Sequence, residues 1–69
     1  MTTLPKLAKQ WAFRSAQSIF QNPESFNVSS NDIDSIVDII KEEIDFTFNI
    51  SSSKEELKVE VLKALNSMA

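Results

Sequence analysis

The chain of 69 residues contains no glycine, and this absence limits its possible folds more than any other feature. Glycine makes up about 7% of an average protein. Tight β-hairpins, phosphate-binding loops and left-handed helix caps rely on it because it has no Cβ. We therefore expect a chain built from helices, without hairpins, phosphate-binding loops or left-handed caps.

Length and composition indicate one small domain. A chain of this length is near the size at which one hydrophobic core only just outweighs chain entropy. It has no cysteine and no histidine, so neither a disulfide nor a structural zinc site is expected. The hydrophobic fraction of 42% is too high for a disordered tail. Oligomerisation or binding to a partner is the remaining way to bury more surface.

Three segments have helical signatures, at about residues 4–21, 30–48 and 53–67. Pro5 suits a first helical turn, and Asn22-Pro23 ends the first segment because the residue before proline avoids the α region. Ser29 or Ser30 can begin the second helix. In the third, Ser52 and Ser53 each precede a glutamate by three residues, which matches a capping box. The sequence thus predicts an all-α, small three-helix domain.

Residues 44–50 allow a second interpretation. Their apolar residues alternate at Ile44, Phe46, Phe48 and Ile50, which favours a strand. Inside the chain only the weak segment 26–28 could pair with it, so a strand here would need a second chain. The alternative fold is therefore α+β, with a short strand pairing with another chain. We expect helix to about Phe48 because no helix breaker precedes it.

The apolar residues of each predicted helix fall on recognisable faces at about 100° per residue. The expected core comprises Leu4, Leu7, Ala8, Trp11 and Ile19 in the first helix, Ile33, Ile36, Val37, Ile40 and Ile44 in the second, and Leu57, Val61, Ala64, Leu65 and Met68 in the third.

A second apolar stripe exceeds what a three-helix core needs. Phe13, Ala16 and Phe20 form it on the first helix, flanked by Lys9, while Ile39 and Phe46 lie off the main stripe of the second helix. Surplus apolar stripes of this kind are typical of interfaces. We predict that they bind a protein partner or a second copy of the chain, as a homodimer or larger oligomer.

Charge is unevenly distributed along the chain. The first 22 residues contain three cations and no acid, whereas all ten acidic residues follow them. Lys6, Gln10, Arg14 and Gln17 could contact nucleic acid, since arginine and glutamine form bidentate contacts with base edges. Alternatively, the basic first helix could lie on a membrane surface. The net charge of −3 argues against both, so a protein partner is preferred.

No residue pattern predicts catalysis, a metal site or a cofactor. Without histidine or cysteine, the serines lack their usual activating base. Asp32, Asp34 and Asp38 do not fit a calcium loop, which needs a glycine and a final glutamate. Glu42 and Asp45 extend the acids into a face that we expect to be solvated, with docking of a basic partner as the alternative. No membrane span or secretory signal is expected, and the lack of cysteine is compatible with the cytoplasm. We therefore expect a non-enzymatic, self-associating protein–protein interaction module, which by size would suit a regulator, inhibitor or adaptor.

Overall fold

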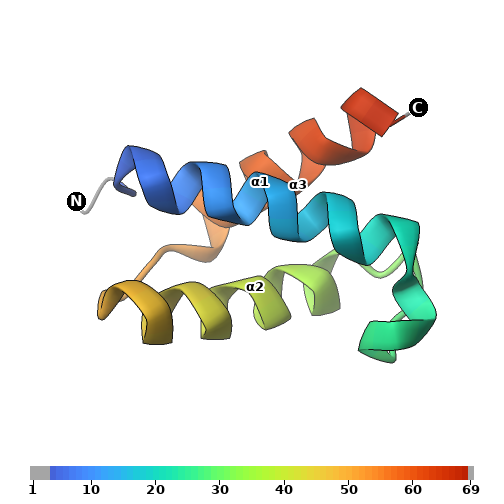
Figure 1. The fold of residues 1–69 in the computed structure, drawn as a ribbon, viewed down its shortest axis with the longest axis horizontal. Helices are drawn as coiled ribbons and strands as arrows, with labels where there is room; N and C mark the ends of the chain where they lie inside the picture. Colours follow the sequence, from blue (N-terminus) through green and yellow to red (C-terminus); the bar gives the residue numbers. More distant parts are fainter. Residues whose placement is uncertain (1–3, 69) are drawn as a thin grey trace.

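The computed structural model describes residues 4–68 and contains three α-helices with one short 3-10 helix (Figure 1). Helix α1 spans Lys6–Gln21, η1 spans Pro23–Phe26, α2 spans Ile33–Phe48 and α3 spans Lys54–Met68. Residues 4–68 include no strand. The predicted all-α, three-helix fold is confirmed, and the alternative strand at residues 44–50 is wrong because α2 continues through Phe48.

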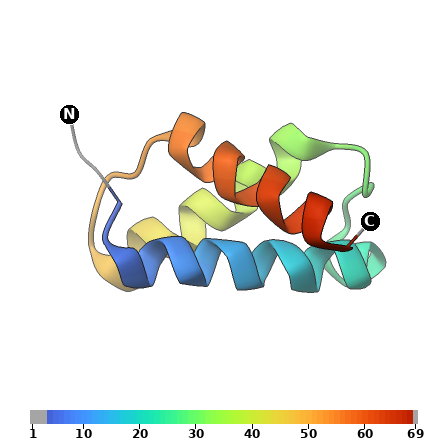
Figure 2. The ribbon, with the colours of Figure 1, turned by 90° about the horizontal axis from the view of Figure 1, so that it is seen from above.

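Helices α1 and α2 run in opposite directions, and α3 passes behind α1 (Figure 1). Figure 2 shows that α2 is inclined to α1, and that its end lies nearer to α1 than its start does. Seen from above, α3 is inclined to α1 and packs against it along much of its length (Figure 2). It also packs against α2. One face of the α1–α2 pair is thus covered by α3, and no helix of residues 4–68 covers the opposite face.

The cores of α2 and α3 lie largely where the sequence places them. Buried residues of α2 are Ile36, Val37, Ile40 and Ile44, and those of α3 include Leu57, Val61 and Ala64. Ile33 is partly buried against this cluster. The prediction is wrong for Leu65 and Met68, which remain exposed, because α3 diverges from α2 towards its C-terminal end (Figure 1).

The core face of α1 differs from the predicted one. Its buried residues are mainly small: Ala8, Ala12, Ala16 and Ile19, with Leu4 just before the helix. Leu7 is 68% exposed and Trp11 is 42% exposed, so their assignment to the core is wrong. Alanines at every fourth position form a narrow ridge that allows close approach of neighbouring helices, and this ridge is fully buried in the core that α1 shares with α2 and α3. The larger side chains then lie on its flanks.

Polar side chains and asparagines define the helix ends. Asp32 caps α2 by accepting a hydrogen bond from the backbone N–H of Ser35 at 3.2 Å, so the helix begins later than the predicted residue 30. Ser53 accepts one from the N–H of Glu55 at 3.2 Å, at the start of α3. Asn27 and Asn49 adopt left-handed conformations, with φ of 61° and 53°. The expectation that no left-handed cap would occur is wrong, because asparagine substitutes for glycine at these ends.

Candidate functional site

The uncovered side of the α1–α2 pair exposes large apolar side chains. Phe46 of α2 is 88% exposed, and Leu7 and Trp11 of α1 are exposed as well. At 100° per residue, these α1 residues share one side of their helix with Arg14, while Ile39 and Glu43 share a side of α2 with Phe46. We call this surface the α1–α2 face; its residues are Leu7, Trp11, Arg14, Ile39, Glu43 and Phe46.

Trp11 is held in a defined orientation at the seam between the two helices. Its indole N–H donates a hydrogen bond to Oε1 of Glu43 at 2.5 Å, and the hydroxyl of Ser15 donates to the same oxygen at 3.4 Å. The Trp11 and Phe48 rings meet edge to face, with centroids 6.0 Å apart and planes at 89°. An aromatic residue fixed in this way loses little conformational entropy when a partner covers it.

Two shallow hollows follow the seam. The first, of about 350 Å³, is lined by residues of α1 and the end of α2: Leu7, Gln10, Trp11, Arg14, Thr47 and Phe48. The second, of about 200 Å³, lies further along α1 and includes Ser18, Phe26, Ile39 and Glu43 in its lining. Both could receive apolar side chains of a partner, and Arg14 is the charged residue that lines the first.

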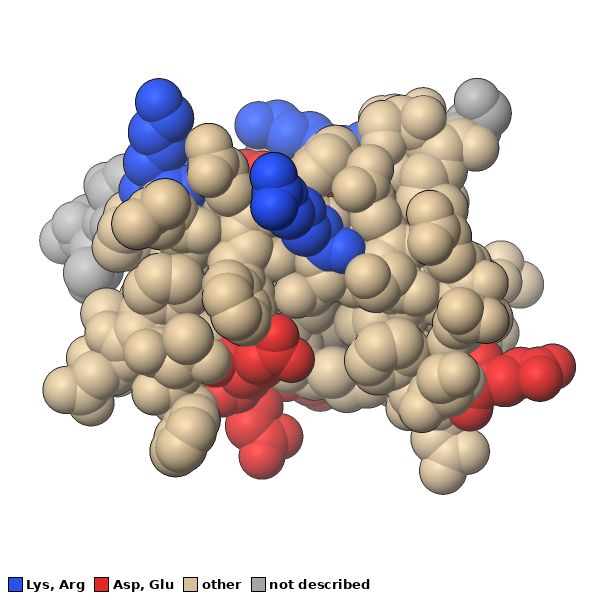
Figure 3. Space-filling view, viewed as in Figure 1, with Lys and Arg blue, Asp and Glu red and all other residues tan. Residues whose placement is uncertain are grey.

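Charge on this face is divided between the two helices. Figure 3 shows lysine and arginine atoms mainly over its upper part, where α1 runs, and acidic atoms mainly over its lower part. Most of the remaining surface in this view is uncharged (Figure 3). Arg14 and Glu42 are both exposed, and neither forms an ion pair with another residue in the range 4–68. Both charges are therefore available to a partner.

The structure separates the residues that the sequence assigns to partner binding. Phe13 and Phe20 are partly buried against the core, Ala16 is fully buried and Lys9 is half-buried. Phe13 and Lys9 instead line a hollow between α1 and Glu60 of α3.

On α2, Ile39 is also partly buried, and only Phe46 of the predicted set is largely exposed. Sequence reasoning missed Leu7 and Trp11 as surface residues. The four-residue spacing of Ala8, Ala12 and Ala16 indicates that α1 buries a different side from the one that carries Leu7 and Trp11.

The residues predicted for nucleic-acid contact remain along one side of α1. Lys6, Gln10 and Arg14 are exposed there. Gln17 is half-buried, and its side-chain amide donates to the hydroxyl of Ser67 in α3 at 3.3 Å. Three of the four side chains are thus directed to solvent in a row, with Arg14 also belonging to the α1–α2 face.

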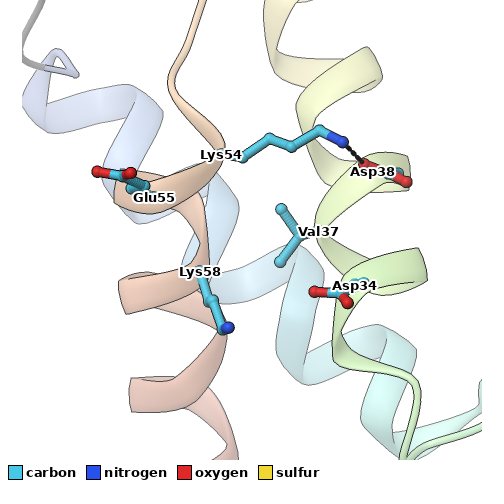
Figure 4. A pocket seen from close by; sticks show the side chains of 6 residues that line it. All are labelled: Asp34, Val37, Asp38, Lys54, Glu55 and Lys58. Carbon is cyan, nitrogen blue, oxygen red and sulfur yellow. Dashed lines mark ion pairs between the residues drawn. The ribbon is translucent and has the colours of Figure 1, made fainter.

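The predicted acidic face of α2 is partly occupied by contacts within the chain. In a polar hollow between α2 and α3, Lys54 reaches across to Asp38, with 2.8 Å between its Nζ and Oδ1 of the aspartate (Figure 4). This hydrogen bond raises the pKa of Lys54 above its ordinary value. Lys58 lines the same hollow opposite Asp34 (Figure 4). Cations therefore accompany the acids here, so the hollow offers no uniform charge to a partner.

Residues 4–68 contain no group of three or more acidic side chains placed to hold a metal ion. No helix within this range combines the length and apolar character that a membrane span requires. Comparisons with protein-family models, curated proteins and solved structures found no match.

Proposed function

We propose that this chain is a small, non-enzymatic protein-binding module of the cytoplasm, and that it binds through the α1–α2 face. The observation that carries the proposal is that Leu7, Trp11 and Phe46 are all exposed and that their helical positions assign them to the side of the α1–α2 pair that α3 leaves uncovered. Exposed apolar residues scattered singly are common, but a cluster on one face is typical of an interaction site.

The composition of the face also supports protein binding. Tryptophan and arginine are enriched among the residues that contribute most to protein–protein affinity, and Trp11 and Arg14 line the same hollow. The hydrogen bond to Glu43 orients Trp11 before any partner arrives. A role as regulator, inhibitor or adaptor is a further proposal that rests on the small size of the chain.

The row of Lys6, Gln10 and Arg14 supports a second candidate function, binding of nucleic acid through α1. Arginine and glutamine can read base edges, and these three side chains are exposed on one side of the helix. With Lys9, α1 has three cations, which give few phosphate contacts, and the net charge of −3 opposes them. Protein binding is therefore the preferred proposal.

A comparison of three baits tests the proposal. The wild-type chain, the Phe46→Glu variant and the Lys58→Glu variant would be immobilised and exposed to lysate of the source cell. Phe46 is 88% exposed, so its replacement should leave the fold intact, as circular dichroism can verify. Lys58 lies on the side of α3 away from the α1–α2 face, and its reversal changes the net charge more than Phe46→Glu does.

We expect proteins that the wild type and Lys58→Glu retain to be lost from Phe46→Glu. Equal retention by all three baits would refute binding through the α1–α2 face.

A further inference from the structure

We propose that the α1–α2 face binds a second copy of this chain, with α1 of each copy lying over α2 of the other. The two copies would be related by a two-fold axis that runs along the seam between α1 and α2, in the direction of α1. This inference rests on the proposed function, because it names the partner of the same face. It follows from the positions of the exposed apolar residues and from the division of charge.

The exposed apolar residues of the face, Leu7, Trp11 and Phe46, lie towards one end of the molecule. Because α1 and α2 run in opposite directions (Figure 1), the start of α1 lies beside the end of α2. The 6.0 Å separation between the Trp11 and Phe48 rings fixes this register, and Leu7 and Thr47 line the same hollow. Phe46, two residues before Phe48, is thus near the level of Trp11.

A two-fold rotation about this axis generates the second copy. Each end of the second copy lies at the same level as the corresponding end of the first, and its α1 lies over α2 of the first. The rotation therefore sets Leu7 and Trp11 of one copy over Phe46 of the other, and the same contact occurs a second time with the copies exchanged. Such self-complementarity is what a symmetric dimer interface requires. Each Phe46 would enter the region of the first hollow of the opposite copy.

The same rotation brings opposite charges together. Arg14 lies three residues after Trp11, roughly 4.5 Å along α1, and Glu42 lies four residues before Phe46, roughly 6 Å along α2 in the same direction. When Trp11 covers Phe46 of the other copy, Arg14 is therefore near the level of the opposite Glu42. Neither residue has an ion-pair partner within residues 4–68 of its own chain.

Charge also selects this arrangement over two others. A two-fold axis perpendicular to the helices would place the cations of α1 over the same cations of the second copy. A partner helix of uniform charge that lies along the seam would be attracted by the charges of one helix and repelled by those of the other (Figure 3). A second copy related by the proposed axis complements both the cations of α1 and the acids of α2, and electrostatic complementarity of this kind fixes the orientation of partners.

Sedimentation equilibrium over a concentration series tests whether the second copy binds. We expect the wild type to reach twice its 7.8 kDa mass at high micromolar concentration. Phe46→Glu should raise the dissociation constant at least about 100-fold, because the change removes an anchor twice per dimer. Lys58→Glu should leave the constant unchanged. A wild type that stays at 7.8 kDa up to millimolar concentration would overturn the inference.

Charge reversal tests the orientation of the two copies. Arg14→Glu and Glu42→Arg should each weaken their own homodimer about tenfold, because each places like charges opposite one another at two positions. An equimolar mixture of the two variants should form a heterodimer with nearly the wild-type affinity. Folded variants that fail to recover affinity on mixing would overturn the proposed axis.

The two sets of experiments separate this inference from the proposed function. If the wild type is monomeric but the Phe46→Glu bait loses a partner that Lys58→Glu retains, the face binds a different protein and only the second-copy inference falls. If a wild-type dimer persists unchanged in Phe46→Glu, the copies meet elsewhere, and the apolar residues of α3 such as Leu62, which are also exposed, become the interface.

Discussion

The carboxylate of Asp45, near the end of α2, accepts two hydrogen bonds from Ser52, which precedes α3. The backbone N–H of Ser52 donates at 2.8 Å and its hydroxyl at 2.6 Å, both to Oδ1. The other oxygen, Oδ2, accepts from the ammonium of Lys41 at 2.6 Å. Partial desolvation tends to raise the pKa of Asp45, but the hydrogen bonds from Lys41 and Ser52 outweigh it and lower that pKa below its ordinary value. One ionised side chain thus fastens the connection between α2 and α3.

The lowered pKa of Asp45 predicts an acid-sensitive contribution to stability. A carboxyl group with a lowered folded-state pKa stabilises the fold above its ordinary pKa near 3.9, and this stabilisation disappears as the pH falls through the lower folded value. Asp45→Asn should therefore be less stable than the wild type at pH 6, by up to about 1 kcal/mol. The difference should shrink as the pH falls below about 4. Urea denaturation at a series of pH values measures both effects.

Glu42→Gln is the matched control for that experiment, because Glu42 is an exposed acid of the same helix without an ion pair in the range 4–68. A stability difference for Asp45→Asn that is the same at every pH would contradict the proposed role of the Asp45 charge.

The left-handed residue at the end of α2 predicts opposite effects of two substitutions. Asn49 has φ of 53°, a conformation that a β-branched residue adopts at a cost of about 1–2 kcal/mol and that glycine adopts freely. Asn49→Val should therefore lower the free energy of unfolding by about this amount, while Asn49→Gly should retain or slightly raise it. Urea denaturation of the pair gives the answer, and equal stability of the two variants would argue against a left-handed cap at this position.

Two phenylalanines should respond differently to truncation. Phe20 packs against the core, whereas Phe46 is largely exposed. Phe20→Ala should cost about 2 kcal/mol or more of the free energy of unfolding, while Phe46→Ala should change it by less than about 0.5 kcal/mol. Measurements at low micromolar concentration keep association from contributing. The reverse order would mean that Phe20, and not Phe46, belongs to a surface site.

Two leucines test the core face of α1. Leu57 of α3 is fully buried, but Leu7 of α1 is exposed. Leu57→Ala should destabilise the chain by about 2–5 kcal/mol, a large part of what so small a domain has. Leu7→Ala should cost less than about 0.5 kcal/mol. A large loss at Leu7 in thermal or urea denaturation would restore the original assignment of this residue to the core.

The nucleic-acid alternative predicts a salt-dependent interaction. The three cations of α1, on a chain of net charge −3, should give no measurable binding to duplex DNA or to anionic vesicles at about 150 mM salt, where the Debye length is about 8 Å. Fluorescence anisotropy and vesicle flotation check this. Tight binding that is lost when Lys6 and Arg14 are both changed to glutamate would favour the alternative over protein binding.

The sequence predicts α2 well because its apolar stripe is regular and long. Ile36, Val37, Ile40 and Ile44 leave one arrangement that buries all of them. The ambiguous end of this helix becomes helical because residues 44–48 have no strand partner among residues 4–68, and because Asp45 and Asn49 stabilise the helix end and the turn after it. Neither stabilising contact is visible in the hydrophobic pattern.

The face of α1 could not be predicted from the size of its apolar residues. A helical wheel favours Trp11 and Leu7 as core because they are large, but the packing distance between helices decides which side is buried. Ala8, Ala12 and Ala16 are fully buried, their small side chains allow neighbouring helices to approach closely, and the large residues are then displaced to the flanks. The candidate site consists of these displaced residues, which is why the predicted interface shares only Phe46 and the partly buried Ile39 with the α1–α2 face.

The position of Trp11 on the α1–α2 face gives the protein its own optical reporter. The chain has one tryptophan and no tyrosine, so nearly all of its near-ultraviolet fluorescence comes from this half-exposed indole. Whatever covers the face would remove water from the ring and shift its emission to shorter wavelength, without any attached dye. A titration followed at that wavelength would therefore report occupancy of this face in particular, and a ligand that binds elsewhere would leave the spectrum unchanged.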